Sequence, residues 1–186
     1  LGMNMILMPY SELAISVYSV YAKLQQFIFM PVMGMNSALI AIVGYNYGAQ
    51  KKQRIYQATR YSLIAAAVIM AVGTLLFQLA PQTLLGMFKA SAEMLEIGIP
   101  ALKTISLSFV FAGVSIVLCS IFQALDDGML SLWVSLGRQL ILVLPLAWLL
   151  SVWGGLNRLW LAFVISEAIC MLFSIAMYRR VRVRQI

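Results

Sequence analysis

The stretch Leu24–Gln50 reads LQQFIFMPVMGMNSALIAIVGYNYGAQ and contains no charged side chain. About 20 consecutive apolar residues allow an α-helix to cross the roughly 30 Å hydrocarbon core of a bilayer. Comparable stretches recur along the chain, and only the last contains a charge, Glu167. They lie at Tyr61–Phe88, Thr104–Leu125, Gln139–Asn157 and Leu159–Tyr178. The sequence therefore predicts five membrane-spanning helices.

The overall composition supports the same class of protein. Of 186 residues, 63% are hydrophobic and 10% are charged, whereas a soluble domain has about 45–50% apolar and about 25% charged residues. The apolar stretches are also too long and continuous for the alternating strands of a β-barrel. We expect an all-α, polytopic transmembrane helix bundle.

Turn residues divide this bundle into segments. Spans are predicted at about 13–46, 57–87, 93–124, 129–152 and 157–179, in a single transmembrane lobe covering 1–186. A short apolar piece at 1–8 precedes Pro9, and we interpret it as the end of a truncated first helix. Pro31, Pro100 and Pro145 fall inside spans, where each proline removes a helical hydrogen bond and favours a kink.

The basic residues predict the orientation. The net charge is +7, but the basic residues gather at the ends of spans, which favours membrane orientation over nucleic-acid binding. The first connection and the C-terminal tail should therefore be cytoplasmic, in a plasma membrane of the bacterial type. The residues concerned are Lys51, Lys52, Arg54 and Arg60 in the connection, and Arg179, Arg180, Arg182 and Arg184 in the tail.

Four ionisable residues lie at membrane depth within predicted spans, where charges are costly and commonly functional. Lys23 and Lys103 lie about ten residues from a helix end, so each could extend to the interface instead of serving a site. Arg138 and Glu167 lie on neighbouring antiparallel spans and could form a structural ion pair. If they do not pair, Glu167 is the candidate for a proton or cation relay.

Polar and methionine side chains gather on the first long span. Gln26, Met33 and Asn36 follow at helical spacing, which suits an adaptable organic ligand or, alternatively, contacts between helices. We expect no enzymatic activity, because the chain has no histidine, no glycine-rich phosphate loop and no paired carboxylates at membrane depth. Cys119 and Cys170 are too far apart in sequence to suggest a metal site.

One motif resembles a known family. Residues 30–38 read MPVMGMNSA and residues 43–49 read VGYNYGA, ahead of a basic connection. This pattern resembles the multidrug and toxic compound extrusion (MATE) transporters, which have twelve spans in two six-helix lobes. The order of the spans resembles the C-terminal lobe. The motif residues are Pro31, Gly34, Gly44, Gly48, Ala49 and Arg54.

The resemblance implies efflux of organic, often cationic drugs in exchange for H⁺ or Na⁺, by rocking of the two lobes around a central cavity. The implied partners are the bilayer, a missing N-terminal lobe and small organic substrates, with no nucleic acid and no cofactor. The cavity wall would include Gln26, Met33, Asn36, Ser106 and Phe109.

One feature departs from the family pattern. Family members with a cation site in this lobe carry acidic residues on its first and fourth helices, but no carboxylate follows Glu96 within the span 93–124. The coupling site is therefore expected outside this chain, unless Glu167 contributes.

Two other functions remain open. A lipid or polysaccharide flippase of the same superfamily would use basic cavity residues such as Lys23, Lys103 and Arg138. A membrane subunit without transport activity is the third possibility.

Overall fold

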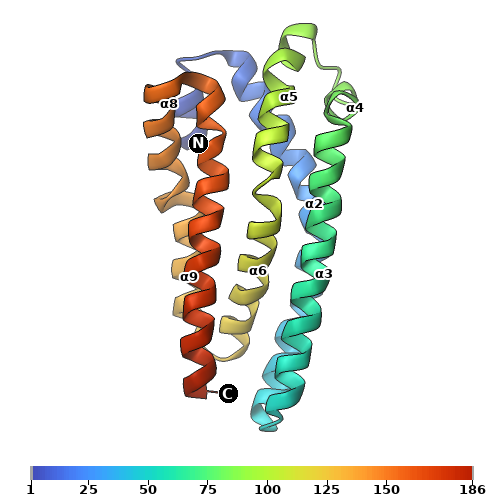
Figure 1. Cartoon of the computed structure of the whole chain (residues 1–186), viewed down its shortest axis with the longest axis vertical. Coiled ribbons are helices and arrows are strands. Elements are labelled where there is room, and N and C mark those ends of the chain that lie inside the picture. The colour runs from blue at the N-terminus through green and yellow to red at the C-terminus, as the bar shows by residue number, and fades with distance from the viewer. Residues whose placement is uncertain (1, 186) are drawn as a thin grey trace.

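The computed structural model describes residues 2–185, with side chains as far as Arg182. Every regular element in this part of the chain is helical, and Figure 1 shows long helices running roughly side by side. The elements are α1 (Gly2–Leu7), α2 (Glu12–Gly48), α3 (Lys52–Leu79), α4 (Pro81–Gly86), α5 (Ala92–Ser106), α6 (Phe109–Ala124), α7 (Gly128–Leu136), the π-helical η1 (Gly137–Ile141), α8 (Val143–Leu159) and α9 (Leu161–Gln185).

Four helical segments are long and apolar enough to cross a membrane: α2, α3, the α7–η1–α8 segment and α9. The consecutive helices α5 and α6 pass the same test together, although they are bent by 46° relative to each other. The expected all-α transmembrane bundle is confirmed, and the five predicted spans correspond to these four segments and the bent pair.

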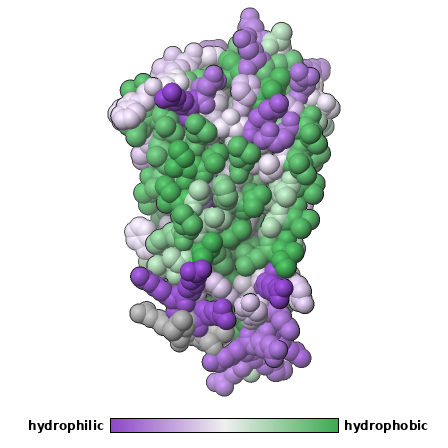
Figure 2. All heavy atoms as spheres, viewed as in Figure 1, coloured by the Kyte–Doolittle hydropathy of each residue, from purple (hydrophilic) through white to green (hydrophobic). Residues whose placement is uncertain are grey.

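The α6 helix occupies the centre of the bundle. It packs against α2, α3, α7 and α9, while α8 packs against α9 and α1. Its residues are buried on nearly every face, and this agrees with the sequence of α6, which is apolar without a clear helical period. Figure 2 shows an apolar band across the middle of the face in view and polar side chains at both ends, as expected for a protein in contact with lipid.

Aromatic side chains fill the core beside α6. The Phe109 ring lies at the centre of this group, with its centroid 5.0 Å from that of Phe77 and 5.4 Å from that of Phe29. Tyr21 stacks on Phe109 at 6.5 Å. Such edge-to-face and offset arrangements are the favoured geometries of aromatic pairs, and they fix α2, α3 and α6 relative to one another.

The first two predicted spans differ from the structure in detail. α2 continues through Pro31 without a break and begins one residue before the predicted span, because the Ser11 hydroxyl accepts a hydrogen bond from the Leu13 N–H (2.9 Å) and caps its first turn. The span predicted at 57–87 is two helices. α3 ends at Leu79, and Pro81 begins α4 at the first helical position, where its missing N–H costs nothing.

The span predicted at 93–124 breaks at Leu107–Ser108, not at Pro100, which lies within α5. The backbone N–H groups of Leu107 and Ser108 bond three residues back instead of four, which tightens the helix. On α3, the Gln78 side-chain amide donates to the Lys103 carbonyl (2.7 Å) and to Ser106 Oγ (3.1 Å). The neighbouring helix thus satisfies polar groups that the break leaves free.

The last two spans meet at a glycine turn. Gly155 has a φ of +69°, a value that favours glycine, and it interrupts the helical backbone between 143 and 159. The break expected between the predicted spans 129–152 and 157–179 is therefore present, although helical structure resumes before α9 begins at Leu161. Upstream, the residues 129–152 include the π-helical η1 rather than one uniform helix.

Candidate functional site

Two adjoining pockets form a polar hollow on the side of the bundle where α2, α6, α7 and η1 meet. One has a volume of about 300 Å³ and the other about 390 Å³, and they share Met33, Arg138 and Gln139. We call their union the polar hollow. Its other lining residues include Gln25, Gln26, Phe29, Met30, Asn36, Ser37, Ser115, Ser120, Gln123 and Ser135.

The hollow offers hydrogen-bonding groups that do not all have partners within the protein. Asn36 is only 6% exposed, and its Oδ1 has no hydrogen-bond partner. The Gln123 amide donates to Ser131 Oγ (2.8 Å), which fixes this side chain between α6 and α7. Buried polar groups are usually paired, so the unpaired Oδ1 of Asn36 is an exception at the wall of the hollow.

Methionine and aromatic side chains supply the remainder of the wall. Met30 and Met33 lie on α2 and are 67% and 49% exposed, with Phe29 beside them. Thioether side chains are flexible and polarizable, and aromatic faces attract cations. Together with the amides, these groups suit an organic molecule that is apolar over most of its surface.

An ion pair lies at the back of the hollow. Arg138 Nε on η1 is 3.7 Å from Glu167 Oε1 on α9, and both side chains are 13% exposed. The structure therefore confirms the pairing interpretation of these two residues. Arg138 Nη1 and Glu167 Oε2 have no further partner, so the pair is incompletely hydrogen-bonded.

The π-helical segment positions Arg138 and Gln139 in this wall. The Leu142 N–H bonds to the Gly137 carbonyl five residues back (3.0 Å), and Pro145 follows with no N–H to donate. A π-turn inserts an extra residue into the helix and is frequent at functional sites. Here it broadens the helix at the residues that line the hollow.

The structure brings together three of the five residues predicted for the cavity wall, Gln26, Met33 and Asn36. Ser106 and Phe109 are corrections, because both are completely buried. Ser106 lies at the α5–α6 break, where Gln78 bonds to it, and Phe109 lies in the aromatic core. Neither side chain lines the hollow.

The lysines expected at membrane depth do not contribute to the hollow either. Lys23 and Lys103 are exposed, and Lys23 Nζ lies 5.9 Å from the centroid of the Phe88 ring near the α4–α5 connection. This placement agrees with the alternative in which the lysines extend to the interface.

Sequence reasoning missed several residues of the wall. Gln139 follows Arg138 directly, and its polar amide could have indicated a place in the wall. A regular helix, however, would point the side chains of consecutive residues 100° apart, so the sequence did not suggest that both line the same hollow. Gln123 and Ser135 reach the hollow only because α6 and α7 pack together.

The motif residues lie along α2, in the α2–α3 turn and, for Arg54, in the first turn of α3, outside the wall of the hollow. Gly44 is half-buried, and a Cβ atom there would lie 3.7 Å from the Ala124 carbonyl oxygen. The others, Pro31, Gly34, Gly48, Ala49 and Arg54, are exposed. In the described part of the chain, no group of three or more potential ligands is placed to hold a metal ion.

Comparison with known proteins identifies the family of this chain. The MatE family model matches residues 1–149. The chain belongs to the MATE family. The resemblance read from the α2 motif is thus confirmed.

Curated relatives of this MATE chain are multidrug export proteins. It is 22% identical over 170 residues to the multidrug export protein MepA of Staphylococcus haemolyticus, covering 91% of this chain and 37% of that protein. It is 23% identical to MepA of Staphylococcus saprophyticus, covering 92% of this chain and 38% of that protein. The chain therefore spans less than half the length of these relatives.

Solved structures show the same fold. An outward-facing multidrug resistance MATE family transporter of the MOP superfamily superposes with a TM-score of 0.92 at 20% identity, covering 99% of this chain and 42% of that one. The bent form of the Vibrio cholerae MATE transporter VcmN gives 0.92 at 18% identity, covering 98% and 42%. A MOP superfamily transporter from Pyrococcus furiosus, whose reversed pocket polarity suggests a different function, gives 0.84 at 20% identity, covering 98% and 43%.

Proposed function

We propose that this chain forms the C-terminal lobe of a transporter that exports organic, often cationic, drugs in exchange for H⁺ or Na⁺, without enzymatic chemistry. The observation that carries the proposal is the polar hollow, in a chain whose relatives are named as multidrug export proteins. The hollow would face the other lobe and form half of the substrate cavity.

The charges around the hollow fit a cationic or neutral substrate. Arg138 is the only charged residue among the described residues that line it, and Glu167 lies within ion-pair distance of that guanidinium. A cation would therefore meet amide and hydroxyl oxygens, sulfur atoms and the Phe29 ring without a neighbouring uncompensated positive charge.

The coupling ion requires a different place. In the part of the chain that the structure describes, no carboxylate lines the hollow, and Glu167 is engaged with Arg138. We therefore propose that the H⁺ or Na⁺ site lies in the remaining lobe, with this chain supplying the opposing wall.

Dye export by the complete transporter tests this function. We expect export from cells lacking other pumps to stop when the H⁺ and Na⁺ gradients are collapsed, and export that persists without both gradients would refute the coupling. Replacing Asn36 by Ala removes one buried hydrogen-bonding group and should reduce export about tenfold. Gln57→Ala, an exposed amide outside the hollow, is the matched control and should leave export unchanged.

The flippase alternative has less support. Of its three basic residues, only Arg138 lines the hollow, and it is paired. A flippase would lose movement of lipid-linked substrates when exposed Lys103 is changed to Ala, whereas the drug exporter proposed here would keep its dye export.

A further inference from the structure

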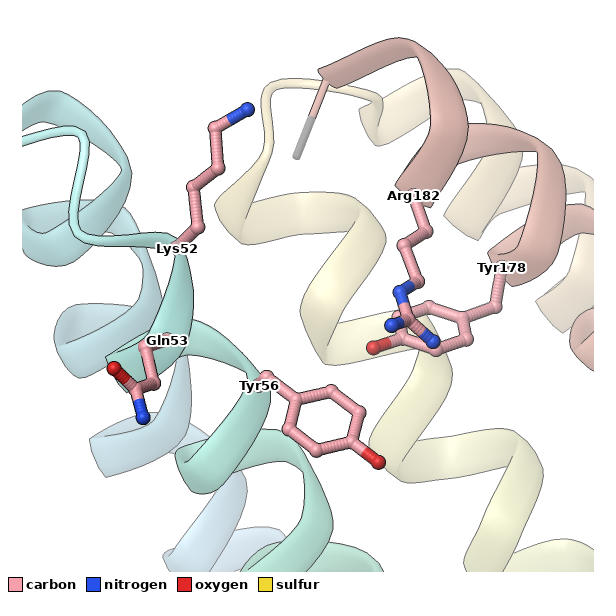
Figure 3. Close-up of a pocket in the computed structure, with 5 residues that line it drawn as sticks. All are labelled: Lys52, Gln53, Tyr56, Tyr178 and Arg182. Carbon is pink, nitrogen blue, oxygen red and sulfur yellow. The ribbon is translucent and has the colours of Figure 1, made fainter.

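A second pocket, of about 330 Å³, lies at the end of the molecule that carries the α2–α3 turn. Figure 3 shows its five lining residues, Lys52, Gln53 and Tyr56 from the start of α3, and Tyr178 and Arg182 from α9. The helices α3 and α9 both pack against α6, and Figure 1 shows α6 between them. This basic pocket shares no residue with the polar hollow.

Among the side chains that the structure describes, the two cations of the pocket have no acidic partner. No carboxylate lines it, and the only ion pair among the side chains described, up to Arg182, is that of Arg138 with Glu167. Lys52 and Arg182 thus leave a positive charge uncompensated by a salt bridge. An anion is the ligand that this arrangement favours.

The Arg182 side chain is held in place by an aromatic ring. Its Cζ lies 5.0 Å from the centroid of the Tyr56 ring, within the range of a cation–π contact. Figure 3 shows the guanidinium in line with the Tyr178 ring of α9, with the Tyr56 ring of α3 to one side. A guanidinium stacked in this way keeps its N–H groups free, and their fork geometry matches the oxygens of a phosphate.

The pocket lies at the depth of lipid headgroups. Figure 2 shows polar side chains gathered at the lower end of the molecule, directly below the apolar band. Tyrosine is enriched at this interface in membrane proteins. Ile64 and Val68 are exposed apolar residues that follow Tyr56 and Arg60 along α3, each four residues after the one before. One stripe on the surface of α3 therefore leads from the pocket into the apolar band.

We propose that the basic pocket binds the phosphate of an anionic phospholipid. Arg182 and Lys52 contact the phosphate oxygens, the two tyrosine hydroxyls donate to the headgroup, and the acyl chains lie along the apolar stripe of α3. A zwitterionic lipid binds less well, because the pocket offers no carboxylate to its ammonium group. The bound lipid connects the ends of α3 and α9.

Titration of the purified complete protein with phosphatidylglycerol in detergent, read by native mass spectrometry, tests the proposal. The double variant Lys52→Gln/Arg182→Gln should bind the lipid about thirtyfold more weakly, because each substitution removes a charge-assisted contact with the phosphate. The matched variant Lys51→Gln/Arg180→Gln removes the same charge outside the pocket and should change the affinity less than about threefold.

A second pair of variants keeps the net charge constant. Tyr56→Leu removes the ring beneath Arg182 and should weaken phosphatidylglycerol binding about threefold to fivefold. Tyr61→Leu, an exposed tyrosine one and a half turns further along α3, should have no effect. Size-exclusion profiles and melting temperatures of all four variants verify that they are folded.

Three results would overturn the proposal. Equal losses in the pocket and matched variants would assign binding to general surface charge. Equal affinity for phosphatidylcholine would exclude selection by headgroup charge. Displacement of the lipid by millimolar inorganic phosphate would make this a site for a soluble anion. None of these readouts depends on drug export, so the lipid site and the transport function can fail separately.

Discussion

Arg138 and Glu167 make the strongest prediction at the scale of single residues. Removing one partner of a buried ion pair leaves an uncompensated charge, which costs about 3 kcal/mol or more. Glu167→Ala should therefore lower the melting temperature of the purified protein clearly. The double variant Arg138→Leu/Glu167→Leu should return close to the original stability, because both charges are gone.

Exposed Arg158 provides the control for this pair. Arg158→Leu removes a positive charge outside the bundle interior and should leave the melting temperature nearly unchanged. If Glu167→Ala proved as stable as the Arg158 variant, the pair would contribute nothing to the fold, and Glu167 would again be free for a role in ion coupling.

Single residues also show what the sequence could and could not predict about the site. Gln26, Met33 and Asn36 were correctly grouped because they lie at helical spacing on one continuous helix. Ser106 and Phe109 were wrongly placed on the cavity wall. Ser106 is buried at the α5–α6 break, where Gln78 bonds to it, and Phe109 begins α6, which is apolar on nearly every side. Without a polar face, its sequence does not indicate which direction leads to the cavity and which to the core.

At the scale of elements, the existence of the spans was predictable and their breaks were not. Long apolar stretches indicate membrane helices directly, whereas a proline shows only that one hydrogen bond is missing. The structure accommodates the missing hydrogen bond differently at each of the three prolines. α2 continues through Pro31, α5 contains Pro100 before breaking at Leu107–Ser108, and a π-turn precedes Pro145. Each outcome depends on contacts with neighbouring helices. One such contact is the Gln78 side-chain amide of α3, which donates to the Lys103 carbonyl and to Ser106 Oγ.

The helices α2 and α3 approach each other closely at Gly73. Gly73 on α3 is buried, and a Cβ atom there would collide with the side chain of Ile28 on α2. Gly73→Ala should therefore destabilise the protein by about 1–3 kcal/mol through overpacking, although alanine is the better helix former. Thermal unfolding of the purified protein measures this cost.

The compensating change tests whether the collision is the cause. Ile28→Ala removes the colliding atoms, so the double variant Gly73→Ala/Ile28→Ala should be more stable than the sum of the single effects predicts. Purely additive effects would mean that the two helices move apart freely and that their close approach is not required.

At the scale of the whole molecule, the fold tolerates large changes in sequence. A TM-score of 0.92 at 20% identity means that the pattern of apolar spans and turns, more than individual side chains, specifies the bundle. Under the proposed function, the walls of the hollow contact the substrate. The amides and methionines around Arg138 are thus the residues to vary when substrate preference is studied.

The two ends of the bundle should lie on opposite sides of the membrane. In Figure 1 the α2–α3 turn and the C-terminal end lie at one end of the bundle, and the α4–α5 connection lies at the other. The basic residues of the first end should hold it in the cytoplasm. Ala49 and Ala92 are exposed residues at the two opposite ends, and each can carry a single cysteine once Cys119 and Cys170 are replaced by serine.

A membrane-impermeant maleimide applied to intact cells should label Ala92→Cys at once and Ala49→Cys only after permeabilisation. The cysteine-free protein controls for background, and retained dye export shows that the labelled variants are folded. Labelling of Ala49→Cys in intact cells would invert the orientation. The basic pocket would then face the outer leaflet, and the polar hollow would have to load substrate from the opposite side.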